Sequence, residues 1–337
     1  MDRLKQNSRA EKPPDMRALE GNYMKRIGLA ILAAGLVAAV VPGFAASTEQ
    51  GQGQAVVTVM PKGENPADLN IPSQNLQVKV NGKQSSVTNW ERLRGPENPL
   101  ELVILMDSSA RASIGTQLGE IESFVKEMPN NTKIAIAYMD NGRTVFTGTL
   151  SSDPAQVLNG LHLPGGAPGQ SGSPYFCLSD LAKHWPSEDR TARREVVMIT
   201  DGVDYYNLRY DPEDPYVHAA IEDSVRSGLV VYSIYWTNQG RIDRSGYENA
   251  AGQNLLLEVT QATGGNSYWE GTGNPVSFEP YFRDLRQRFV NQYRLSFSAG
   301  LKGKPEMQTM NLKVGGLSAK IYAPQQVFVN HAGTAGE

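Results

Sequence analysis

The chain has 337 residues, 40% of them hydrophobic and 20% charged, which is typical of one large globular domain with additions, or of two domains. Its net charge of −3 argues against nucleic acid as a partner, because binding to a phosphate backbone requires an excess of Lys and Arg. Cys177 is the single cysteine, which excludes an internal disulfide framework and any cysteine-based zinc site.

The N-terminal region predicts an export signal. A short basic stretch precedes the apolar run 27–41, and small residues follow that run, in the order of a secretory signal peptide. We predict cleavage after Ala45 or Ala46, and the sequence leaves open whether translation starts at Met1 or Met24. An uncleaved anchor is the alternative, but the run is shorter than the roughly 20 residues of a membrane span. We expect a periplasmic or secreted protein that meets the membrane only through this signal.

The next segment predicts a flexible lead followed by a small β unit. Residues 47–54 are polar and rich in Gly and Gln, and 55–59 is a candidate strand. The run 76–80 alternates apolar and polar residues, and Asn81-Gly82 separates it from a second alternating run, a strong hairpin signal. The unit is too short to be an independent domain, so we expect it to pack on a later part of the chain.

From about residue 96, strand-like and helical segments alternate. The predicted strands are 102–106, 133–138, 144–146, 195–200, 229–236 and 268–269, and the predicted helices are 114–128, 153–161, 175–185, 217–225, 255–262 and 281–289. This alternation predicts an α/β fold with a doubly wound, mostly parallel Rossmann-like sheet and helices on both faces. The turn Asn141-Gly142 predicts one antiparallel edge strand.

The last part of the chain predicts further β-structure, so the α/β sheet would carry small β extensions at both ends. The N-terminal hairpin is a candidate partner for these strands. The expected organisation is a signal region at 1–46, a linker and small β unit at 47–95, the α/β domain at 96–293, a β extension at 294–330 and a disordered tail at 331–337.

Two of the predicted strands end in aspartate, at Asp107 and Asp201. The carboxyl ends of parallel strands meet at one edge of a sheet, where ligands of such folds bind. Two buried carboxylates at one edge repel each other unless a cation or protons lie between them. Together with serine hydroxyls they form a hard oxygen ligand set, suited to Mg²⁺, Mn²⁺ or Ca²⁺.

The segment from about Leu100 to Tyr293 resembles a von Willebrand factor type A (VWA) domain, and most of all the exported bacterial VWFA-related subgroup. The resemblance rests on Asp107-Ser108-Ser109, on a loop hydroxyl at Ser173 or alternatively Ser171, on Thr200-Asp201-Gly202 with Asp204, and on Thr263-Gly264-Gly265. It implies a metal-ion-dependent adhesion site (MIDAS) with Asp107, Ser109, Ser173 and Asp201 as ligands. In that family the ion takes a carboxylate from a protein or peptide partner and catalyses nothing.

Arg111 departs from the family pattern, because it stands where a second ligating serine is expected. Guanidinium has only donors, so it cannot bind a cation. Three interpretations stay open: Arg111 points away and the site binds Mg²⁺ weakly, Arg111 pairs with Asp107 and Asp201 in place of the ion, or the edge is inert. In the second case Arg111 could itself receive a partner's carboxylate.

The residues around the second aspartate give a candidate contact surface. We expect Asp204, Tyr205 and Tyr206 to take part in partner binding beside Arg111, although packing within the loop is the default interpretation for the tyrosines. Ser113 is expected to cap the following helix. The chain shows no nucleophile elbow or phosphate loop, so we predict no enzyme. The favoured function is an exported adhesion or protein-binding module; the alternative is a structural or assembly domain of the cell envelope with a vestigial, metal-free site.

Overall fold

The computed structural model describes residues 49–62, 71–208, 213–240, 246–316 and 318–332, all within one compact unit that begins at Ala46. The predicted signal peptide and most of the predicted tail lie outside these residues. Within the described ranges, no helix has both the length and the apolar character needed to cross a membrane. Export therefore stays a prediction from the sequence.

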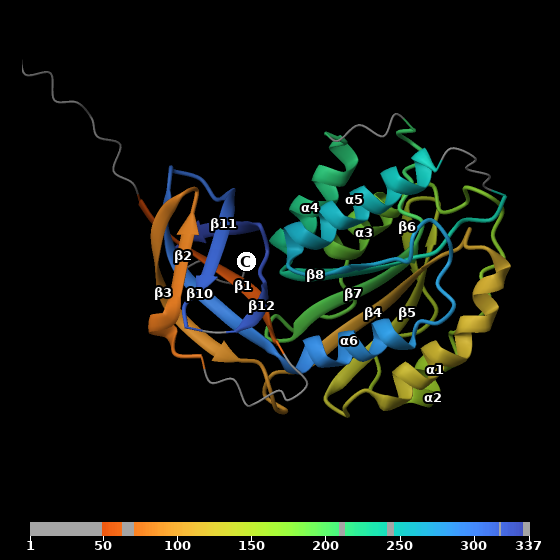
Figure 1. Cartoon of the computed structure of the whole chain (residues 1–337), viewed down its shortest axis with the longest axis horizontal. Coiled ribbons are helices and arrows are strands. Elements are labelled where there is room, and N and C mark those ends of the chain that lie inside the picture. Colours follow the sequence, from red (N-terminus) through yellow and green to blue (C-terminus); the bar gives the residue numbers. More distant parts are fainter. Residues whose placement is uncertain (1–48, 63–70, 209–212, 241–245, 317, 333–337) are drawn as a thin grey trace, which may run out of the picture. The chain divides into compact units, whose positions relative to one another are not determined.

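One sheet has six strands in the order β6-β5-β4-β7-β8-β9 (Figure 1). Neighbouring strands are parallel except at β6, which runs antiparallel to β5 at the edge. The strands are β4 (Leu100–Asp107), β5 (Thr132–Asp140), β6 (Arg143–Phe146), β7 (Arg193–Thr200), β8 (Leu229–Tyr235) and β9 (Ser267–Tyr268). Every residue of β4 and β8 is buried, as expected for strands covered on both faces.

Helices cover both faces of this sheet (Figure 1). The elements are η2 (Ala112–Gln117), α1 (Leu118–Glu127), α2 (Pro154–Leu158), α3 (Pro174–Lys183), α4 (Pro215–Arg226), α5 (Tyr247–Thr263) and α6 (Glu279–Val290). On one face Phe124 of α1 stacks on Phe282 of α6 in a core with β4, while α3, α4 and α5 pack on the other face. Helix starts follow their capping residues, since Asp153 and Asp214 both accept backbone N–H bonds in the first turn.

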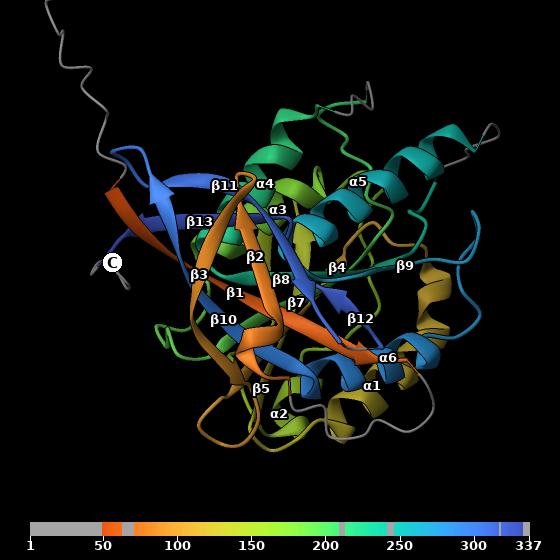
Figure 2. The same ribbon diagram turned by 60° about the vertical axis from the view of Figure 1, so that its left-hand side comes forward.

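The remaining strands form a closed antiparallel β-barrel, shown in front in Figure 2. They are β1 (Glu49–Pro61), β2 (Leu76–Val80), β3 (Lys83–Arg92), β10 (Gln292–Leu301), β11 (Glu306–Val314), β12 (Ala319–Tyr322) and β13 (Gln326–His331), with the short helix η1 (Ser73–Asn75) before β2. Six of them pair in the cycle β1-β10-β3-β2-β11-β13, which the pairing of β13 with β1 closes, and β12 adds to the end of β1. Val57, Leu295 and Val329 contribute to a separate core inside it.

The fold-class prediction is therefore wrong. In place of one doubly wound sheet with small β extensions, the structure contains a closed antiparallel six-stranded barrel and a separate mixed sheet. The physical reason is the long-range pairing of β1 with β10, which brings Glu49 opposite Leu301. Local alternation predicts strands, but it does not show that strands from the two ends of the chain close on each other.

The flexible lead predicted at 47–54 is also corrected, because β1 begins at Glu49. Its glycines have a packing role. A Cβ on Gly53 would lie 2.5 Å from the Phe297 ring, and one on Gly51 would lie 2.6 Å from a Val329 methyl carbon. Glycine here allows neighbouring barrel strands to approach closely, so a composition typical of a linker belongs to a barrel strand whose glycines face inward and whose glutamines are exposed.

Several local predictions are confirmed. Asn81-Gly82 joins β2 to β3 and Asn141-Gly142 joins β5 to β6, and all four residues have the positive φ angles of tight hairpin turns. Gly264 ends α5 with φ of 86°. The predicted cap at Ser113 is wrong, because Ser113 lies inside η2 and Arg111 precedes that helix without a side-chain cap.

Candidate functional site

The candidate site lies at the carboxyl ends of three neighbouring parallel strands. β4 ends at Asp107, β7 ends at Thr200 just before Asp201, and β8 ends shortly before Asn238. In the register, Met106 is opposite Ile199, so Asp107 and Thr200 stand next to each other one residue further on. This register brings the two predicted strand-end aspartates to one edge of the sheet.

Asp107 is fully buried, and both of its carboxylate oxygens accept hydrogen bonds. The backbone N–H of Ser109 donates to Oδ1 at 2.8 Å, and the Thr200 hydroxyl donates to Oδ2 at 2.8 Å. No Lys or Arg among the described residues forms an ion pair with it. Burial raises the pKa of Asp107 above its ordinary value, and the bonds from Thr200 and Ser109 offset only part of that effect. The site therefore holds a carboxylate that a cation or a proton would stabilise.

The loop hydroxyl beside Ser109 is that of Ser171. Ser109 Oγ lies 3.3 Å from Ser171 Oγ and also accepts the backbone N–H of Ser171 at 3.1 Å. Ser173, the first choice from the sequence, is equally buried but caps α3, where its hydroxyl accepts the N–H of Phe176. The structure thus groups Asp107 with Ser109 and Ser171.

Asp201 is buried, and its Oδ1 accepts the backbone N–H of Val203 at 3.0 Å. Its backbone is held by close packing against α5, because a Cβ built on Gly252 would lie 2.2 Å from the Asp201 carbonyl oxygen. On the other side, the Tyr175 hydroxyl donates to the Gly202 carbonyl at 2.7 Å. The turn that carries Asp201 is therefore fixed by contacts from two helices.

The predicted partner-binding residues differ in exposure. Asp204 is fully buried, and its Oδ1 accepts the N–H of Tyr206. Burial raises the pKa of Asp204, and the bond from Tyr206 opposes that shift. Tyr206 is 55% exposed with its ring against Phe176, and Arg111 is also exposed. Tyr205 is half-buried, so Tyr206 and Arg111 are the most exposed members of this group.

Arg111 lies at the side of the site, where its chain bonds to the segment after β8. Its Nε donates to the Asn238 carbonyl at 3.1 Å, and its backbone N–H donates to the Thr237 carbonyl at 3.0 Å. Among the described residues, Arg111 forms no ion pair with Asp107. This geometry favours the interpretation in which Arg111 points away from Asp107.

The sequence assigned no role of their own to two residues of the site. Thr200 supplies the hydroxyl on Asp107, and its signal was its position as the last residue of a buried strand, directly before Asp201. Asn238 follows the next parallel strand. It is fully buried, its side-chain N–H groups lower the pKa of Asp107, and its Oδ1 has no hydrogen-bond partner among the described residues. Attention to every strand end along this edge would have found both.

The donor set at this edge fits a hard divalent cation. Asp107, Ser109, Ser171 and Asp201 offer only oxygen atoms, and the Asn238 amide oxygen is a buried acceptor without a donor. Oxygen ligands without nitrogen or sulfur suit Mg²⁺, Mn²⁺ or Ca²⁺. Across the described part of the chain, no three His, Cys, Asp or Glu side chains gather closely enough to form a metal centre of their own.

Cys177 lies close beneath the site on α3. Its thiol is fully buried, and it lies 3.8 Å from the Ser171 carbonyl oxygen. Burial raises the pKa of this thiol well above its ordinary value, so the reactive thiolate is scarce at neutral pH. Cys177 packs the loop that carries Ser171 rather than reacting.

Comparisons with known proteins give no family assignment. No family model matches the chain, and no curated protein matches it. Solved structures that it resembles include an aerotolerance-related membrane protein from Bacteroides fragilis NCTC 9343, with 17% identity, TM-score 0.39 and coverage of 56% of this chain and 98% of that one. They also include BatB from Bacteroides thetaiotaomicron, with 17% identity, TM-score 0.36 and coverage of 56% of this chain and 96% of that one. A third is the VWA domain of SpRpn10, with 12% identity, TM-score 0.33 and coverage of 50% of this chain and 86% of that one. Similarities this weak assign neither a family nor a function.

Proposed function

We propose that this protein is an exported, non-enzymatic interaction module that captures a carboxylate of a protein or peptide partner at the edge formed by Asp107, Ser109, Ser171 and Asp201. The observation that carries the proposal is the buried Asp107 carboxylate, which lacks a basic partner among the described residues and accepts bonds from the Ser109 N–H and the Thr200 hydroxyl. The resemblance of the strand-end pattern to VWA adhesion sites adds to it, and export rests on the signal peptide in the sequence.

The charge balance of the edge explains why a divalent ion would belong there. Asp107 and Asp201 are both fully buried, and two buried carboxylates at one sheet edge are costly without a positive charge between them. When bound, Mg²⁺ supplies that charge and an open position for an oxygen ligand from the partner. Thr200 would keep Asp107 oriented, and Ser109 would keep the Ser171 loop in place.

Arg111 and Tyr206 would form the surrounding contact surface. Tyr206 is exposed next to the Ser171 loop, since a Cβ on Gly172 would lie 3.0 Å from the Tyr206 ring. Tyr is favoured at protein interfaces because it offers a large rigid ring with one polar group. A cation at Arg111 would add attraction for an acidic partner without occupying the ligand position.

Calorimetric titration of the purified chain with Mg²⁺ tests the site. Wild type and Arg111→Ser should bind, and Arg111→Ser should bind more tightly because it removes a neighbouring positive charge and adds a hydroxyl. Asp107→Asn should remove the binding. Glu122→Gln is the matched control, since Glu122 is an exposed acid on α1 that pairs with Lys126 and is not one of the strand-end residues. Equal heats for wild type and Asp107→Asn would contradict the proposal.

The alternative is a structural or assembly domain of the cell envelope with a vestigial, metal-free site. The observation that favours it is that both oxygens of Asp107 already accept bonds from the protein, so joining the strand ends would be a sufficient role for this residue. Pull-down from the native envelope, with Asp107→Asn and Asp201→Asn beside wild type, separates the two functions. Loss of the captured partner in both variants supports the adhesion site; unchanged capture supports the alternative.

A further inference from the structure

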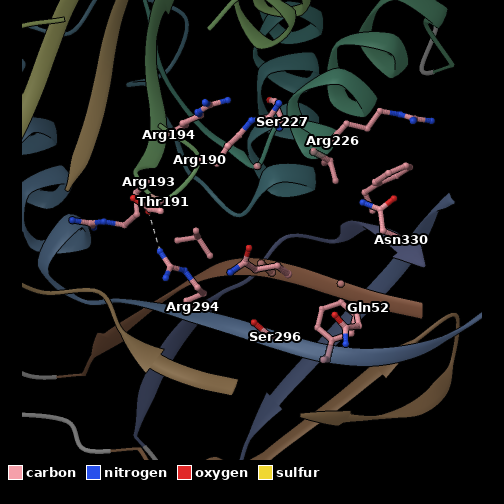
Figure 3. Close-up of a pocket in the computed structure, with 18 of the residues that line it drawn as sticks. Gln52, Arg190, Thr191, Arg193, Arg194, Arg226, Ser227, Arg294, Ser296 and Asn330 are labelled. Atoms are coloured by element: carbon pink, nitrogen blue, oxygen red, sulfur yellow. Dashed lines mark hydrogen bonds between the residues drawn. The ribbon is translucent and has the colours of Figure 1, made fainter. Parts of the chain in front are cut away.

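A second site is suggested by a cavity of about 430 Å³ away from the strand-end aspartates (Figure 3). Its walls come from the barrel strands β1, β10 and β13, from the segment that leads into β7, and from the end of α4. Five arginines line it: Arg190, Arg193, Arg194, Arg226 and Arg294. Among the lining residues that the structure describes there is no Asp or Glu, so every fully charged side chain of the lining is a cation.

The carboxylates near these arginines lie outside the lining. Arg226 Nη2 pairs with Glu222 at 2.5 Å, Arg294 Nη1 with Glu91 at 3.5 Å, and the buried Arg193 with Glu195 at 4.0 Å. Arg294 also donates to the Thr191 carbonyl at 3.1 Å, the bond drawn in Figure 3. These pairs hold the guanidinium groups of Arg226, Arg294 and Arg193 in place and offset part of their charge, and in Figure 3 the charged ends of Arg193 and Arg226 point outward to opposite sides.

Arg190 differs from the other four arginines. It is exposed, and no hydrogen bond or ion pair joins its side chain to another described residue. Its charge acts on Arg194, whose pKa is lowered mainly by burial; Glu101 opposes that shift and Arg190 adds to it. Burial likewise lowers the pKa of Arg193, Glu195 opposes that shift, and Arg294 adds to it. Arg190 and Arg294 therefore each add positive charge near a second arginine, and an anion in the cavity would reduce the resulting repulsion.

We propose that this cavity binds a small multivalent oxyanion, one that carries phosphate or carboxylate groups. Guanidinium presents parallel N–H donors that match both groups with two bonds at once. Gln52 and Asn330 add neutral polar groups on the barrel side of the cavity. The volume lies within the range of roughly 300 to 1,000 Å³ found for small-molecule sites. The site is separate from the strand-end aspartates and needs no metal ion.

Calorimetry on the full chain in a buffer without divalent metal ions or chelators tests this site. Pyrophosphate and malonate are titrated separately, with sodium chloride at matched ionic strength as the blank, so the two arms distinguish a phosphate from a carboxylate ligand. Saturable binding of either anion is the expected result. The absence of saturable heat with both anions up to millimolar concentration would overturn the proposal.

Variants locate the binding. Arg190→Gln should raise the dissociation constant of the anion about tenfold. This corresponds to a loss of about 1.4 kcal/mol, close to the value of one charge-assisted hydrogen bond. Because the Arg190 side chain makes no hydrogen bond or ion pair within the described protein, its replacement should leave the unfolding midpoint unchanged. Arg143→Gln, at an exposed arginine outside the cavity, is the matched control and should bind as wild type does. Equal affinity in Arg190→Gln and Arg143→Gln would overturn the assignment. Asp107→Asn should keep anion binding, so this test is independent of the adhesion site.

Discussion

The hydroxyl of Thr200 donates to Asp107 Oδ2 at 2.8 Å, which joins the carboxyl ends of β7 and β4 through a fully buried hydrogen bond. Because a hydroxyl can donate and accept, Thr200 adapts to either charge state of its partner. The bond therefore orients Asp107 whether a proton or a cation neutralises it.

We expect Asp107→Asn to keep the fold with a change of less than about 1 kcal/mol in unfolding free energy, because the amide oxygen can accept from Ser109 and Thr200 can turn to accept from the amide. Asp107→Ala leaves the Ser109 N–H and the Thr200 hydroxyl without a partner, and should cost about 2–4 kcal/mol. Urea unfolding of both variants measures the difference. Equal losses would show that these bonds contribute little.

The affinity for Mg²⁺ should rise with pH. Burial raises the pKa of Asp107, so at low pH the carboxyl group holds a proton that an arriving cation must displace. As the pH rises through that pKa, the competing proton is lost and binding strengthens. Titrations at pH 5.5 and pH 8 check this, with the affinity expected to be higher at pH 8. An affinity that does not change between the two values would mean that no buried carboxyl group takes part.

Gly252→Ala should disturb the site through the backbone. The new methyl group would lie 2.2 Å from the Asp201 carbonyl oxygen, so the Asp201 turn or α5 must shift, at a cost of about 2–4 kcal/mol. Gly119→Ala is the control, since Gly119 lies in α1 with no atom within 4 Å of its Cβ position, and alanine should stabilise the helix by about 0.5–1 kcal/mol there. Thermal unfolding of both variants should give shifts of opposite sign. A neutral Gly252→Ala would show that the turn yields without strain.

Glu195 should make stability depend on pH. It is fully buried in β7, and burial raises its pKa to about 7, against an ordinary value of 4.5, although Arg193 opposes the shift. Between these values the folded state holds a proton that the unfolded chain has lost, so the contribution of Glu195 to stability falls as the pH rises from about 4.5 to 7.

The raised pKa of Glu195 corresponds to a loss of roughly 3 kcal/mol in the free energy of unfolding across this pH range, because one pKa unit is worth about 1.4 kcal/mol. Glu195→Gln should remove this decline, so the variant gains stability relative to wild type as the pH rises. Unfolding in urea at pH 4.5, 6 and 8 measures the difference, and comparing the two proteins cancels the contributions of other buried acids. Parallel curves for wild type and Glu195→Gln would contradict the assignment.

The sequence predicted local elements well and their long-range assembly only in part. The N-terminal hairpin was a candidate partner for the C-terminal strands, and β3 and β2 do pair with β10 and β11. The hairpin turns at Asn81 and Asn141 follow from residues that tolerate positive φ, and the strand ending at Asp107 follows from a continuous apolar run. The barrel depends on Glu49 meeting Leu301 and Gly51 meeting His331, and no local pattern encodes such a register. The first part of β1 was not predicted as a strand either, because its glycines give it the composition of a linker.

The candidate site shows the same division. Asp107 and Asp201 were visible as aspartates at strand ends, a position fixed by local patterning. The sequence could not decide between Ser171 and Ser173, because both lie in one Gly-rich loop. Only the packed structure shows that Ser173 caps α3 while Ser171 contacts Ser109. Asn238 lies beyond the end of β8, where the sequence offers only position as a signal.

The barrel is built from the first and last strands of the described chain, while the mixed sheet uses the residues between them. During synthesis, β1 leaves the ribosome early, but its partners β10 and β13 follow only after the whole sheet has emerged. All strands of the mixed sheet are therefore synthesised before the barrel is complete, and the barrel can close only after β13 has been synthesised. A chain that stops before β13 would therefore expose the unpaired edge of β1, which marks an incomplete product for aggregation or proteolysis.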